Sequence, residues 1–136
     1  MKRNINLSVI FYILLFFVMS CSRMDVINFF LNEEVAPIIV AVSPPDQEID
    51  VPLDTNIIIE FSQPMNRESV ETAFRIIPTI AGDFDWSTNN KVVAFLPSSN
   101  FQASTTYVEE ISTIAQSEDS ISLSNFESFS FTTASP

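Results

Sequence analysis

Residues 55–64 read TNIIIEFSQP, and this stretch decides the fold class. Apolar side chains recur at every second position, as Ile57, Ile59 and Phe61. Ile58 and Glu60 stand between them, so the run has the two-residue period of a β-strand that buries one face. Pro64 ends the run, because proline has no N–H to donate to a neighbouring strand.

Short runs of β type recur on both sides of this strand, separated by turn residues at intervals of roughly 8–15 residues. They lie at residues 38–43, 74–77, 83–86, 91–96, 107–113 and 129–132. One interruption favours a single helical turn, in which Asn66 is the N-cap and Val70 and Phe74 face the core together. Many short strands in this rhythm predict an all-β fold, an antiparallel β-sandwich of about seven strands.

Composition excludes several classes of chemistry. The chain has 136 residues, and 46% of them are hydrophobic, so it is long and apolar enough to form one ordinary domain. It contains 13 Phe and one Gly. It has no His, and a single Cys, so an imidazole base, a His-containing catalytic triad, an internal disulfide and a cysteine-built zinc site are all excluded. We therefore predict no catalytic residues, no enzyme activity and no cofactor.

The charge is strongly negative once the first 20 residues are set aside. The remainder carries 17 acidic residues against four basic ones, a net charge of −13. Such a body repels nucleic-acid phosphates, so no nucleic-acid partner is expected. Anionic lipid headgroups repel it as well, so charge does not hold it to a membrane.

The N-terminus has the three-part layout of a secretory signal peptide. Lys2 and Arg3 form a positive start, and an uncharged apolar run from 9 to 18 follows. That run is shorter than the roughly 20 residues that a membrane-spanning helix needs, which disfavours the alternative of a permanent transmembrane anchor. We predict a signal peptide over residues 1–20.

The end of this segment, Val18-Met19-Ser20-Cys21, resembles a bacterial lipobox. The resemblance implies that Cys21 becomes the first mature residue and carries a diacylglycerol and an N-acyl chain. Two or three acyl chains anchor a protein firmly to a membrane, where one would not. The alternative is a free thiol beyond an ordinary signal-peptide cleavage site. By the same resemblance Ser22 favours sorting to the outer membrane, on its periplasmic or its surface face.

Residues 21–36 are predicted to be the lipidated N-terminus and a tether, with an apolar patch at 26–31, and residues 37–134 a single domain. Six segments of that domain, in order, resemble the SbsA-type bacterial Ig-like domain of cell-surface proteins. They are VSPPD (42–46), VPLDT (51–55), FSQPM (61–65), FLP (95–97), TTY (105–107) and FSFTT (129–133). The resemblance implies an immunoglobulin-like sandwich, with Tyr107 as a tyrosine corner that ties a sheet crossing to the backbone.

Two features depart from this pattern. Residues 116–121 replace the usual glycine turn after the tyrosine strand. Glu109 falls between Tyr107 and Ile111, where alternation demands an inward side chain. We expect either a bulge that shifts the strand or a carboxylate that reaches the rim as surface charge, since an unpaired buried charge costs too much.

Acidic residues supply the remaining candidate sites. Four of them form a loop between the first two predicted strands and are a weak calcium candidate: Asp46, Glu48, Asp50 and Asp54. They lack the glycine-turned calcium-loop signature, which favours a solvated loop. Asp83 and Asp85 stand two apart on one strand face, a spacing that paired carboxylate catalysis also uses, although simple alternation explains them.

The sequence thus predicts a membrane protein anchored through lipid, whose Ig-like domain is a non-catalytic binding, adhesion or structural module with an envelope protein or a glycan as partner. The alternative is a calcium-dependent carbohydrate binder or a carboxylate-based hydrolase of the envelope. That alternative requires acidic side chains that converge in a concave pocket.

Overall fold

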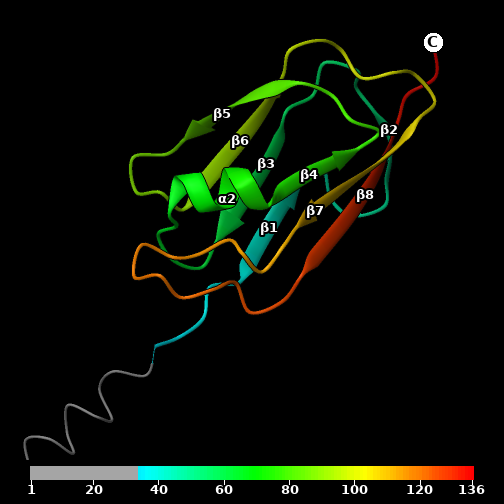
Figure 1. The fold of residues 1–136 in the computed structure, drawn as a ribbon. Helices are drawn as coiled ribbons and strands as arrows, with labels where there is room; N and C mark the ends of the chain where they lie inside the picture. The colour runs from blue at the N-terminus through cyan, green and yellow to red at the C-terminus, as the bar shows by residue number, and fades with distance from the viewer. Residues whose placement is uncertain (1–33) are drawn as a thin grey trace, which may run out of the picture. The chain divides into compact units, whose positions relative to one another are not determined.

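Two stacked four-stranded β-sheets make up the part of the chain that the computed structural model describes, residues 34–136 (Figure 1). The predicted all-β sandwich is confirmed, with eight strands where about seven were expected. The predicted signal peptide, lipobox and Cys21, together with the tether up to residue 33, lie outside the described residues. No helix within residues 34–136 is long and apolar enough to cross a lipid bilayer.

Sheet A is antiparallel throughout and has the strand order β1-β3-β6-β5. Its strands are β1 (Ile39–Ser43), β3 (Ile57–Phe61), β6 (Val92–Pro97) and β5 (Gly82–Trp86). The alternation predicted for β3 is confirmed, because Ile57, Ile59 and Phe61 are at most 2% exposed whereas Ile58 and Glu60 face outward. The central strands β3 and β6 therefore supply one half of the core.

Sheet B has the order β2-β8-β7-β4 and mixes directions, since β2 runs parallel to β8. Its strands are β2 (Glu48–Val51), β8 (Glu127–Thr133), β7 (Thr106–Ile111) and β4 (Phe74–Ile77). Strand β2 corrects the sequence prediction, which placed its residues in an acidic loop. Strand β2 is a short edge strand that is held by main-chain hydrogen bonds to β8, and only its residue Val51 is buried. Its sequence therefore lacks the alternation of apolar and polar residues from which a strand is predicted.

The helical element begins and ends as its sequence requires. Helix α2 (Arg67–Ala73) is capped by Asn66, whose side-chain oxygen accepts a hydrogen bond from Ser69 N at 3.1 Å. Val70 is fully buried and Phe74 half-buried, so the predicted inward pair is confirmed. Because α2 passes directly into β4, it connects β3 of sheet A to β4 of sheet B.

Tyr107 forms the expected tyrosine corner. Its ring is 2% exposed and packs against Phe101, with ring centroids 4.7 Å apart. The backbone N–H of Gln102, five residues earlier, donates to its hydroxyl oxygen at 3.1 Å. The bond fastens the connection between β6 and β7 to the start of β7.

Tyr107→Phe is expected to destabilise the domain by about 1 kcal/mol, because it removes this one hydrogen bond and keeps the packed ring. The measurement is urea unfolding of the variant and the parent at the same pH, followed by the fluorescence of Trp86, the only tryptophan. Tyr107→Leu, which also removes the ring, is expected to cost more. Equal stability of the parent and the Phe variant would show that the corner contributes nothing.

Candidate functional site

Asp46, in the connection between β1 and β2, holds that connection against sheet B. One of its carboxylate oxygens accepts hydrogen bonds from Ser130 N at 2.8 Å and from Ser130 Oγ at 3.3 Å. The backbone bond from Ser130 lowers the pKa of the Asp46 carboxyl, although the side chain lies at the surface. The first of the four calcium candidates therefore already serves as a local acceptor for β8.

The other three calcium candidates are spread along the chain. Glu48 and Asp50 lie within β2, and Asp54 follows in the turn that leads to β3. Within residues 34–136 the structure brings no three His, Cys, Asp or Glu side chains together as a cation would require. The arrangement thus lacks the six to eight converging oxygens that calcium takes.

Asp83 and Asp85 lie where alternation predicts. Both are exposed on the outer face of β5, and Phe84 and Trp86 turn inward and are half-buried. The indole N–H of Trp86 donates to Glu71 Oε1 at 2.9 Å, so even this ring has a structural partner in α2. The two aspartates line neither of the cavities described next. The structure therefore supports a solvated strand face at this position.

A shallow cavity opens between the edge strands β4 and β5 and has a volume of about 390 Å³. Its apolar wall is an aromatic cluster in which the centroids of Phe74, Phe84 and Phe95 are 5.0–5.4 Å apart. Gly82 approaches so closely that a Cβ atom there would lie 2.5 Å from the Phe95 ring. Glu71 and Arg75 are the charged residues of its lining.

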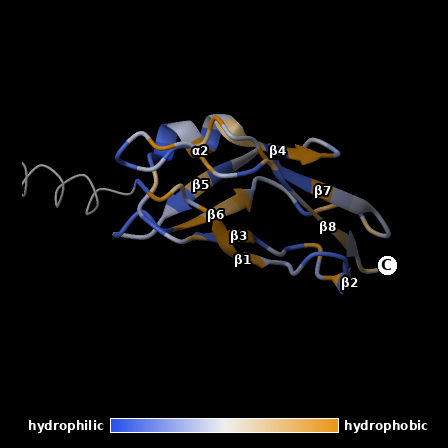
Figure 2. Ribbon diagram, turned by 90° about the horizontal axis from the view of Figure 1, so that it is seen from below, coloured by the Kyte–Doolittle hydropathy of each residue, from blue (hydrophilic) through white to orange (hydrophobic). Residues whose placement is uncertain are grey.

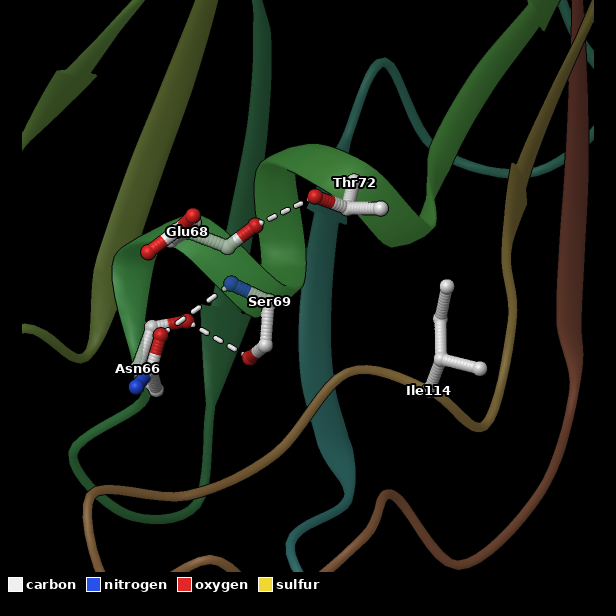
Figure 3. Close-up of a pocket in the computed structure, with 5 residues that line it drawn as sticks. All are labelled: Asn66, Glu68, Ser69, Thr72 and Ile114. Atoms are coloured by element: carbon white, nitrogen blue, oxygen red, sulfur yellow. Dashed lines mark hydrogen bonds between the residues drawn. The ribbon is translucent and has the colours of Figure 1, made fainter.

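The second cavity, of about 330 Å³, lies beside α2 (Figure 3). Its polar groups are used within the helix. Ser69 Oγ donates to Asn66 O, and Thr72 Oγ1 donates to Glu68 O, both at 2.8 Å. Ile114 supplies the facing wall. The free carboxylate of Glu68 is the one ionisable group in the lining, so the cavity holds no acid and base pair.

Glu109 is the unusual ionisable residue of the described chain. It lies at the middle of β7 with its side chain directed between the sheets, and it is 1% exposed. Neither carboxyl oxygen has a hydrogen-bond partner. Its neighbours across the sheet are Ile76 in β4 and Phe129 in β8, both apolar. The carboxyl group is therefore surrounded by the core.

Burial, together with the smaller effect of the negative charge of Asp46, raises the pKa of the Glu109 carboxyl from its usual 4.5 to about 8. At neutral pH the group is accordingly a neutral carboxylic acid. A raised pKa is often a mark of a catalytic acid, but only where substrate can reach the group. Glu109 lines neither cavity, so it is a feature of the core.

Both sequence predictions for Glu109 are wrong. The pairing of β7 with β4 and β8 continues through this residue without a shift, so no bulge moves it outward. Its exposure of 1% also rules out a carboxylate at the rim. Sequence reasoning assumed a charged group, whereas protonation removes the charge and most of the cost of burial. The alternation of the strand, in which Tyr107 and Ile111 point inward, correctly indicated an inward side chain at Glu109.

Comparison with known proteins places this geometry in a family. The sequence model described as "Bacterial Ig-like domain" matches residues 33–133. No curated protein sequence matches the chain.

Solved structures similar to the chain include an L,D-transpeptidase from Mycobacterium smegmatis, with a TM-score of 0.57 and 21% identity over 74% of this chain and 41% of that one. L,D-transpeptidase 1 of Mycobacterium tuberculosis matches with a TM-score of 0.53 and 21% identity, over 72% of this chain and 39% of that one. Domains 1–6 of the surface layer protein SbsC match with a TM-score of 0.52 and 16% identity, over 76% of this chain and 14% of the other.

These likenesses concern the fold alone, because the identities are low and the chain spans less than half the length of each neighbour. The family match covers most of the sequence, including every strand and helix α2 within residues 34–136. The chain therefore belongs to the bacterial Ig-like domain family.

Proposed function

We propose that this protein is a lipid-anchored component of the bacterial cell envelope whose Ig-like domain is a non-catalytic binding, adhesion or structural module. The observation that carries the proposal is the order of two segments. The lipobox-like sequence Val18-Met19-Ser20-Cys21 comes first, and the family match begins at residue 33. A short tether between an acylated cysteine and a folded module suits a protein that acts beside a membrane.

The chemistry of the domain supports a non-catalytic role. Acid and base catalysis needs ionisable groups that converge where a substrate can bind. The acidic side chains of residues 34–136 are instead distributed over separate elements, and Glu109 is sealed within the core. The converging carboxylates that a hydrolase or a calcium-dependent carbohydrate binder would use are not gathered in this part of the chain. We therefore favour recognition through exposed strand faces and loops.

The lipid anchor has a direct test. Cells that express the protein are grown with an alkyne-bearing palmitate analogue, and the purified chain is examined for label and intact mass. The Cys21→Ala variant is expected to lose all label and to retain residues 1–20, because it removes the single cysteine and with it the lipobox. Ser22→Ala, which keeps the lipobox, is expected to be labelled like the parent. Label that persists in Cys21→Ala would contradict the anchor.

The expected location is the outer membrane. Separation of the two membranes by density, followed by detection of the protein in each fraction, tests the preference expected from Ser22. Protease treatment of intact cells then distinguishes the surface face from the periplasmic face. Recovery in the inner membrane would contradict the sorting part of the proposal and leave the anchor intact.

A further inference from the structure

The outer face of sheet A is apolar where a solvated sheet is expected to be polar. An antiparallel sheet with one face in water normally alternates apolar and polar residues along each strand. On the central strands β3 and β6, however, Ile58 and Ala94 stand directly opposite each other on the outer face, and Leu96 lies two residues further along. Ile58 is 41% exposed and Leu96 36%. Figure 2 shows β3 and β6 as largely hydrophobic.

Sheet B provides an internal comparison. Its outward residues on β7 and β8 are mostly hydroxyl-bearing, and Thr106 and Thr132 bond to each other at 2.9 Å. Arg75 and Glu110, which are opposite in charge, are paired across β4 and β7. The apolar exceptions are Val108, Ile77 and, on strand β2, Ile49, which is 67% exposed. The exposed isoleucines of sheet B thus lie on its two edge strands, β2 and β4, whereas in sheet A the central strands β3 and β6 present apolar side chains outward.

Acidic residues border this apolar strip. Asp83 stands directly opposite Leu96, and Asp85 directly opposite Ala94, both on β5. Glu60 lies two residues beyond Ile58 on β3. Among the paired residues of β1, β3, β6 and β5, no outward position is a lysine or an arginine. The strip Ile58, Ala94 and Leu96, with its border Glu60, Asp83 and Asp85, is here called the sheet A face.

The charge of the border selects among possible partners. A second copy would place six carboxylates in one interface with no lysine or arginine on either sheet A face, and such an accumulation of like charge is costly. Anionic lipids and nucleic acids are repelled for the same reason. A polypeptide with an apolar strip between lysine or arginine side chains fits both the centre and the border.

We propose that the sheet A face is a docking surface for a protein partner whose contact region is apolar at its centre and basic at its edges. The proposal rests on the proposed role as a binding module and deepens it by naming the face and the chemistry of the partner. The apolar strip supplies the area that is removed from water, and the three carboxylates select the partner and set its orientation.

The experiment uses the full chain in its own cells, with a photo-crosslinking benzophenone amino acid at position 58, 96 or 128. Ser128, outward on β8, is the control on sheet B. Adducts are expected from 58 and 96 and not from 128, and mass spectrometry is expected to place lysine or arginine on both sides of the crosslinked apolar residue. The double variant Asp83→Lys/Asp85→Lys is expected to reduce the adduct by about tenfold. Asp119→Lys, in the connection between β7 and β8, is expected to leave it unchanged.

Several outcomes would overturn the docking surface. They are equal adducts from all three positions, a crosslinked peptide without basic residues, a crosslink to this same chain or to lipid, or an adduct that survives the charge reversal. Adducts from position 128 alone would reject this face and still support a binding module. No adduct from any of the three positions would reject the docking surface and leave a structural module as the proposed role. The lipid anchor is tested separately by the Cys21→Ala labelling experiment, and the outcome of that test does not affect the interpretation of the crosslinks.

Discussion

Glu109→Met is expected to raise the free energy of unfolding by about 3 kcal/mol at pH 7 and to remove most of its dependence on pH. Methionine is unbranched and similar in length, so it fills the same space in the core without polar atoms. In the parent, two oxygens of a side chain that is 1% exposed have no partner. Replacing such a group by an apolar one of similar shape is commonly stabilising.

The sign of the pH dependence follows from the raised pKa of Glu109, about 8 in the folded protein against a usual 4.5. Between these two values the folded state holds a proton that the unfolded state has lost. Stability from the protonated group is therefore fully present below pH 4.5 and is lost as the pH rises towards 8. The loss is about 1.4 kcal/mol for each pH unit, or about 5 kcal/mol over the whole interval.

Urea unfolding at pH 5, 6, 7 and 8, followed by Trp86 fluorescence, measures this slope. Glu109→Gln is expected to remove the slope but to gain less stability than Glu109→Met, because the amide stays polar and buried. Glu110→Gln, the next residue on β7, is the matched control and should keep the slope of the parent. Equal slopes in the parent and in Glu109→Met would show that the buried group is ionised in the folded protein.

Asp46 affects stability in the opposite direction and at a different pH. The backbone bond from Ser130 lowers the pKa of this carboxyl below its usual 3.8. Its contribution is therefore present above that value and is lost as the pH falls. Measurements at pH 5 and above keep the two effects apart.

Sequence reasoning predicted the parts of the fold that depend on a strong period. Strand β3 alternates over five residues, and β5 follows the same rule at Asp83 and Asp85, so the inward and outward faces of these two strands were predicted correctly. The cap at Asn66 was also predictable, because its chemistry is local. Strand alternation and helix capping can be predicted from local sequence, without knowing which strands pair in the sheets.

Strand β2 and Glu109 show where that reasoning ends. Strand β2 exists because its backbone meets β8, some eighty residues away, and nothing in its own residues reports that contact. For Glu109 the direction of the side chain was available from parity, but its protonation state depends on the surrounding core. The apolar sheet A face could not be recognised either. It appears only once Ile58 and Ala94 are known to be neighbours.

Phe131→Ala is expected to destabilise the domain by about 3–5 kcal/mol, the range for removal of a buried aromatic side chain. Phe131 is 1% exposed in the middle of β8. Its ring stacks on Tyr107 at 5.6 Å and meets Phe101 edge to face at 5.3 Å between centroids. Because stabilities of such domains are about 5–15 kcal/mol, this one change is expected to remove much of the total.

Phe126→Ala is the matched control, because Phe126 is 54% exposed in the connection that precedes β8, and its removal is expected to change stability by no more than about 0.5 kcal/mol. Phe131→Leu, which keeps part of the volume, should lie between the two. Urea midpoints of the three variants give this order directly. A loss near 1 kcal/mol in Phe131→Ala would mean that the core collapses around the missing ring. The contacts of Tyr107 and Phe101 would then contribute less than their packing implies, and Tyr107→Leu, which removes the ring, should in turn cost little more than Tyr107→Phe.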